Sequence, residues 1–116
     1  MPGWSSYGIA KHACIRIAEY LTLEYPTMRA FALNPGMVKG TDTDADLTPF
    51  ALDEQELVGG FTLWLASPKS EGVKGGWLNV NWDVDVLERN AERIVREGLV
   101  RTGFLNAKLG GEGLLE

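Results

Sequence analysis

The chain has 116 residues, of which 45% are hydrophobic and 23% are charged, as in one globular domain or part of a larger one. Its net charge of −5 and pI near 4.9 argue against nucleic acid as a partner, because phosphate binding needs clustered lysine and arginine. No apolar run approaches the ~20 residues that span a bilayer, and no secretory leader is recognisable. With one cysteine in addition, we expect a cytoplasmic protein without a membrane contact.

The first predicted helix runs from Ser6 to Tyr25 and ends before Pro26, which cannot continue it. Small and apolar residues recur in it at steps of three and four, the pattern of a helix with one buried face. This face comprises Tyr7, Ala10, Ala13, Cys14, Ile17, Ala18 and Leu21. We therefore expect Cys14 to be a small core residue and Glu19 to lie on the opposite, exposed surface.

The segment from Met28 to Leu33 is short and almost continuously apolar, as in a parallel strand that is buried on both faces. It stops at Asn34-Pro35-Gly36, because proline lacks a donor and glycine permits unusual backbone angles. The polar, acidic stretch from Lys39 to Asp46 is predicted to be an exposed loop. We expect no metal site, because this loop lacks the glycine and terminal glutamate of a calcium loop and His12 has no second ligand nearby.

Beyond this loop, the pattern predicts a further helix, strand and helix. The expected elements are a proline turn at Thr48-Pro49, a helix that follows Asp53 and runs to about Ala66, a turn over Gly72–Gly76, a strand over Trp77–Asn81 and a helix over Val86–Glu97. Gly59 and Gly60 interrupt the middle helix at a cost of about 1 kcal/mol each relative to alanine. Close packing is expected around these two glycines as compensation.

The predicted fold class is α/β, because helices and strands alternate and a right-handed crossover joins two parallel strands. Two strands make a poor sheet, since each outer edge leaves backbone groups unpaired. We therefore predict the end of a larger, Rossmann-like doubly wound sheet, with two strands and about three helices and with the N-terminal strands missing. Residues 1–97 are expected to form this partial domain, and residues 98–116 a flexible tail.

Tyr7 and Lys11 are four residues apart, so a helix places them on one face. A phenol beside an ammonium group can carry proton-transfer chemistry, because the cation favours the ionised phenol. The alternative is an ordinary start of an amphipathic helix, with the lysine stem along apolar surface and the tyrosine half-buried. The spacing on its own favours this second interpretation.

Three motifs nevertheless occur in order along the chain. They are Tyr7-xxx-Lys11, the strand end Asn34-Pro35-Gly36-Met37-Val38, and an ending made of Trp64–Pro68, Gly72–Gly76 and Val80–Asp85. Together they resemble the C-terminal half of the short-chain dehydrogenase/reductase family, in its fungal type, over roughly residues 3–97. The resemblance implies a Rossmann fold that binds NAD or NADP and moves a hydride between nicotinamide and a small carbonyl or alcohol, with a role in secondary metabolism.

The resemblance also implies roles for individual residues. Tyr7 would be the general acid/base at the substrate oxygen, and Lys11 would hold the nicotinamide ribose and favour the tyrosinate. Pro35, Gly36 and Val38 would lie along the nicotinamide. Thr41 is the candidate for a phosphate contact, although it stands one residue later than the threonine of the family. The helix over residues 6–25 commonly builds a subunit interface in the family, which implies a homo- or hetero-oligomer.

The sequence departs from the family pattern where the cofactor phosphates would be held. It has no glycine-rich turn after a first strand, and the family's catalytic serine and the residue that reads the adenosine ribose are missing. Two interpretations follow. The chain is either a truncated oxidoreductase that is inactive alone, or an inactive remnant that associates with a full-length relative.

Overall fold

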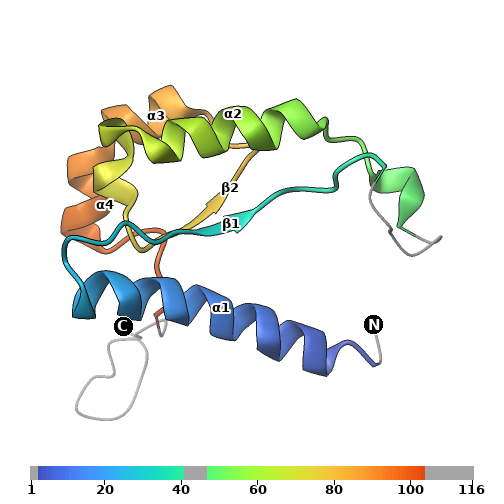
Figure 1. The fold of residues 1–116 in the computed structure, drawn as a ribbon, viewed down its shortest axis with the longest axis horizontal. Coiled ribbons are helices and arrows are strands. Elements are labelled where there is room, and N and C mark those ends of the chain that lie inside the picture. Colours follow the sequence, from blue (N-terminus) through green and yellow to red (C-terminus); the bar gives the residue numbers. More distant parts are fainter. Residues whose placement is uncertain (1–2, 41–46, 104–116) are drawn as a thin grey trace, which may run out of the picture.

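The sheet of the computed structural model, which describes residues 3–40 and 47–103, is a parallel pair of strands. The strands are β1 (Ala32–Asn34) and β2 (Trp77–Asn79), with Leu33 opposite Leu78. Helix α1 (Ser5–Glu24) precedes β1, and α2 (Gln55–Ala66) lies in the connection between the two strands. Figure 1 shows α1 on one side of the sheet and α2 on the other. The predicted α/β class and parallel pairing are therefore confirmed.

The helix ends follow the local signals in the sequence. Helix α1 stops at Glu24, two residues before Pro26, and α2 stops at Ala66, two residues before Pro68. The short 3₁₀-helix η1 (Thr48–Phe50) lies at the predicted proline turn. A second 3₁₀-helix, η2 (Pro68–Val73), was not predicted; it also has a proline in its first turn.

The last predicted helix is in fact two helices. They are α3 (Val84–Arg89) and α4 (Ala91–Glu97), and Asn90 separates them with a non-helical backbone (φ −106°, ψ 11°). Helix α3 starts before the predicted position because the Asp83 side chain accepts a hydrogen bond from the backbone N–H of Asp85, at 2.8 Å. An N-cap is a local signal, so this start was readable from the sequence.

Strand β1 is shorter than predicted, and the assignment of Met28–Phe31 to it is wrong. The backbone of Ala30 and Ala32 bonds to Gly75 and Gly76. These two glycines come just before β2 and belong to a turn and not to a strand. The residues of β1 are half-buried, so the prediction of burial on both faces is also wrong. The reason is that β2 is the only neighbouring strand that β1 has among the described residues.

The hydrophobic core lies between α2, β2, α3 and α4. Its buried side chains are Phe61, Leu65, Val73, Leu78, Val80, Leu87 and Ile94. Leu78 and Val80 are 0% and 1% exposed, so the core is closed around β2 and the residue that follows it. Helix α1 contributes to none of these positions, and most of its predicted apolar face, including Cys14 and Ile17, is exposed.

The buried residues of α1 are Ala18 and Glu19, which contradicts the prediction of an exposed Glu19. The Glu19 carboxylate accepts hydrogen bonds from the backbone N–H of Thr102 at 2.6 Å and from its hydroxyl at 2.9 Å, and it pairs with Arg16. These partners satisfy the buried charge. Thr102, which lies beyond the expected domain boundary, therefore contacts α1. Residues 104–116 lie outside the described residues.

Candidate active site

Tyr7 and Lys11 lie side by side on the first turns of α1. The Lys11 Nζ atom is 5.4 Å from the centroid of the Tyr7 ring, a cation–π distance. The Trp4 ring meets Tyr7 edge-on, with centroids 5.3 Å apart. The fold thus brings a phenol and an ammonium group together on one helix face, as the four-residue spacing predicts.

The surroundings of this pair are open to solvent. Residues 3–14 are all exposed, and Tyr7 and Ile9 keep 55% and 71% of their accessible surface. An acid/base group in water gains little from neighbouring charges, because solvent screens them. The Tyr7–Lys11 pair is therefore uncovered in the part of the chain that the structure describes.

The second part of the site is the segment that follows β1. Pro35 is exposed, and Gly36 adopts φ +74°, in the left-handed region that favours glycine. The backbone N–H of Gly36 donates to the Asn34 side-chain oxygen at 3.1 Å, which closes a tight turn at the end of β1. The prediction that the strand ends at Asn34-Pro35-Gly36 is therefore confirmed. Strand β1 ends at Asn34, one residue later than expected.

Asp53 anchors this segment, although the sequence analysis did not single it out. Its Oδ2 atom accepts the Met37 N–H at 2.7 Å, and its own N–H donates to the Met37 carbonyl at 3.0 Å. The Lys39 N–H in turn donates to the Asp53 carbonyl at 2.9 Å, and the Lys39 side chain pairs with Glu54. An aspartate just before a helix is usually a cap, so no local signal in the sequence indicates this contact with a segment sixteen residues earlier.

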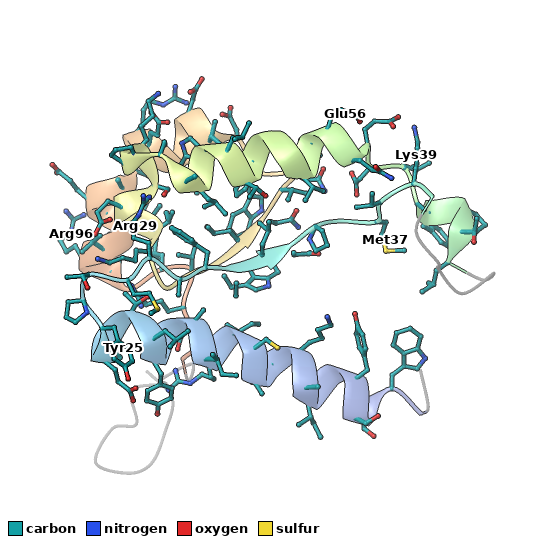
Figure 2. All side chains as sticks on the ribbon, in the orientation of Figure 1. Tyr25, Arg29, Met37, Lys39, Glu56 and Arg96 are labelled. Carbon is teal, nitrogen blue, oxygen red and sulfur yellow. The ribbon has the colours of Figure 1, made fainter. Side chains whose placement is uncertain are left out.

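Val38 lines an open, apolar hollow of about 580 Å³ along α2. The other lining residues are Gln55, Val58, Gly59, Thr62 and Leu63. Figure 2 shows the labelled Lys39 and Glu56 on the α2 side of the segment and Met37 on the side of α1. Neither Tyr7 nor Lys11 lines the hollow.

Gly59 and Gly60 are not closely packed, contrary to expectation. Both are exposed, and a Cβ atom on either would meet no other atom within 4 Å. They border open surface: Gly59 lines the hollow beside Val38, and Gly60 lines a second one beside Trp82. The packing that would offset their cost in helix stability is not found among the described residues.

The two parts of the site point toward the same end of the molecule. In Figure 1, the first turns of α1 and the segment after β1 both run to the right-hand side; the segment continues from the end of β1, and α1 lies below it in this view. Of the remaining candidates, Thr41 and the acidic residues Asp42, Asp44 and Asp46 lie outside the described residues. His12 and Cys14 are exposed on α1.

Comparison with known proteins finds relatives of this chain in one family. A short-chain dehydrogenase/reductase of Claviceps purpurea is 34% identical over 100 residues, which are 81% of this chain and 34% of that protein. A short-chain dehydrogenase of Monascus purpureus is 31% identical over 82% of this chain and 34% of its own length. A short-chain dehydrogenase/reductase of Aspergillus novofumigatus is 31% identical over 78% of this chain and 34% of its own length.

The chain is related to short-chain dehydrogenases/reductases of fungi over about four-fifths of its length. It spans about one third of the length of these relatives. No family model and no solved structure matches it. The described residues carry an exposed Tyr–Lys pair and an anchored strand end. The relatives have about twice as much sequence again outside the match.

Proposed function

We propose that the chain carries the proton-transfer part of an NAD- or NADP-dependent short-chain dehydrogenase/reductase that acts on a small carbonyl or alcohol. One observation carries the proposal: Lys11 Nζ lies 5.4 Å from the Tyr7 ring centroid in a chain that is 34% identical to a fungal short-chain dehydrogenase/reductase. Tyr7 would exchange a proton with the substrate oxygen. Lys11 would bind the nicotinamide ribose.

The segment after β1 supports the nicotinamide side of this proposal. Val38 presents an apolar surface beside the turn at Gly36, which suits a planar ring. The bound cofactor would supply the hydride. The described residues offer no comparable place for its phosphates, and Thr41, the expected phosphate contact, lies outside them.

Because the described residues offer no place for the cofactor phosphates, we propose that the chain needs further sequence to bind the dinucleotide. A direct test titrates NADH and NADPH against the chain alone and against the chain co-expressed with the two-thirds of the Claviceps purpurea relative that lies outside the match. We expect no measurable binding by the chain alone and binding by the complemented protein. Lys11→Met should weaken that binding, whereas Lys69→Met, at an exposed lysine of η2, should leave it unchanged.

Two results of this titration would contradict the proposal. Micromolar binding by the isolated chain would show that the phosphates are held without further sequence. A complemented protein that folds but binds neither dinucleotide would refute the assignment of a nicotinamide-dependent activity. The same titration shows whether the protein prefers NADH or NADPH. We also propose a cytoplasmic location and a role in secondary metabolism.

The second candidate function is an inactive interaction module that binds a full-length relative. It is favoured by the exposed apolar side chains of α1, among them Ile9 and Leu23 at 71% and 70%, and by the free edge of β1 within the described residues. Such a module would bind a full-length short-chain dehydrogenase without changing the partner's requirement for its own tyrosine. The complementation above separates the two, because an inactive module would confer no dinucleotide binding on the remaining two-thirds.

A further inference from the structure

Two segments that lie far apart in the sequence are interlocked at the end of β1. One is the segment Gly36–Lys39, and the other is the stretch Asp53–Gln55, which leads into α2. Asp53 makes hydrogen bonds to both neighbours of Val38, through Met37 and Lys39, and Val38 and Asp53 form a parallel β-bridge. A side-chain amide of Gln55 lies 3.5 Å from the Lys39 carbonyl and adds a weaker contact.

The carboxylate of Asp53 occupies the place that a side chain at position 36 would fill. A Cβ atom on Gly36 would lie 2.3 Å from Asp53 Oδ2, which is too short for a real contact, and 3.2 Å from Asn81 Nδ2, which is tighter than most contacts. The carboxylate thus lies directly against the Gly36 backbone while it accepts the Met37 N–H at 2.7 Å. A charged acceptor makes a stronger hydrogen bond to an amide than a neutral one does.

This contact sets the orientation of the peptide between Gly36 and Met37. The Gly36 N–H is held by Asn34 and the Met37 N–H by Asp53, so two successive peptide groups are fixed by side chains from different elements. Val38 follows directly and lines the hollow along α2. The direction in which Val38 presents its backbone and side chain therefore depends on Asp53.

We propose that Asp53 is a positioning residue, whose carboxylate holds Gly36–Val38 in the conformation that meets the nicotinamide. This inference rests on the function proposed above. Asp53 touches neither Tyr7 nor Lys11 and takes no part in proton transfer. It acts through the Met37 amide, so its effect on the cofactor is a matter of affinity and geometry.

The first arm of the test uses the full 116-residue chain and NMR of the Met37 amide. We compare wild type with Asp53→Ala, Asp53→Asn and, as a matched control, Glu56→Gln, a nearby acid on the exposed first turn of α2. Asp53→Ala should raise hydrogen exchange of the Met37 amide by about tenfold or more, because it removes a charge-assisted hydrogen bond. Asp53→Asn keeps an acceptor oxygen and should give a smaller increase, and Glu56→Gln should give none.

The second arm measures dinucleotide affinity in the complemented protein. Asp53→Ala should raise the dissociation constant of the preferred dinucleotide about tenfold, and Asp53→Asn should restore part of the loss. An unchanged dissociation constant in Asp53→Ala, or an unchanged Met37 amide, overturns the positioning role alone. If the wild-type complemented protein binds no dinucleotide, the proposed function fails, and the positioning role fails with it.

Discussion

Arg29 joins the start of the sheet to the end of α2 through a single side chain. Its guanidinium donates to the carbonyls of Leu65 and Ala66 at 2.9 and 3.2 Å, and also to Ser67 and Ser70. A helix C-terminus leaves carbonyls without intrahelical partners and carries partial negative charge, so a cation with a fork of donors stabilises it. Lysine lacks this fork and cannot reach several carbonyls at once.

Replacement of Arg29 should therefore be costly even by lysine. We expect Arg29→Ala to lower the free energy of unfolding by about 2 kcal/mol and Arg29→Lys by more than half of that. Urea denaturation followed by tryptophan fluorescence measures both. Arg93→Lys is the control, since Arg93 is exposed on α4, where it pairs with Glu97, and the change should alter the stability little. A lysine variant as stable as wild type would contradict the role given to the fork.

Gly36 is the position where the backbone leaves no room for a side chain. Gly36→Ala combines a left-handed φ of +74° with a Cβ atom 2.3 Å from the Asp53 carboxylate. We expect it to lower the free energy of unfolding by about 1–3 kcal/mol. Gly59→Ala is the matched control: it lies inside α2 with open space around it and should raise the stability by about 0.5–1 kcal/mol. Equal effects of the two alanine substitutions on stability would contradict the conclusion that the end of β1 leaves no room for a side chain at position 36.

At the scale of elements, α1 is attached to the rest of the molecule mainly by its C-terminal half. Its buried residues, Ala18 and Glu19, lie there, and the Glu19 carboxylate binds Thr102. Thr22 on the next turn lies against Gly75, where a Cβ atom would be 3.0 Å from its hydroxyl. The N-terminal half, which carries Tyr7 and Lys11, has no buried residue.

Loss of the Glu19 carboxylate should free the segment that follows α4. Glu19→Ala removes the acceptor of the Thr102 N–H and hydroxyl, so we expect faster tryptic cleavage after Arg101 and a loss of about 1–3 kcal/mol in unfolding free energy. Glu24→Ala, at an exposed glutamate of the same helix, is the control. Cleavage after Arg101 at the wild-type rate in Glu19→Ala would show that this segment is held by other contacts.

The helices were predictable because their ends are local signals, whereas burial was not. Pro26 and Pro68 fix the ends of α1 and α2 within two residues. The apolar periodicity of α1 predicts a buried face. Among the described residues, however, nothing packs over Cys14 or Ile17, and both are exposed. Burial depends on what packs against a helix, and a periodic pattern does not identify that partner.

The local features of the candidate site were predictable from the sequence, whereas the contact between its distant segments was not. The Tyr7–Lys11 pairing follows from helix geometry, and the turn at Gly36 follows from the proline and glycine. The contact of Asp53 with Met37 joins residues sixteen positions apart through an intervening stretch without regular periodicity. Such a contact depends on how the chain returns to the sheet edge, which no local pattern encodes.

At the scale of the whole molecule, the core and the candidate site are separate. The buried cluster lies around β2 with α2, α3 and α4, whereas Tyr7 and Lys11 lie on the uncovered half of α1. No helix in residues 3–40 or 47–103 is long and apolar enough to cross a membrane. With the free edge of β1 in the described residues, this distribution favours a fold that is completed by the further sequence found in the relatives.

We propose that Tyr7 transfers the proton once the two-thirds of a relative's sequence outside the match is supplied. The most direct measurement is NADPH and NADH oxidation by the complemented protein with a panel of small ketones and aldehydes, for wild type and Tyr7→Phe. We expect turnover by wild type and a rate that is about 10²–10⁴-fold lower in Tyr7→Phe. The dissociation constant of the dinucleotide should change little in the variant. Turnover by Tyr7→Phe at the wild-type rate would contradict the proposal.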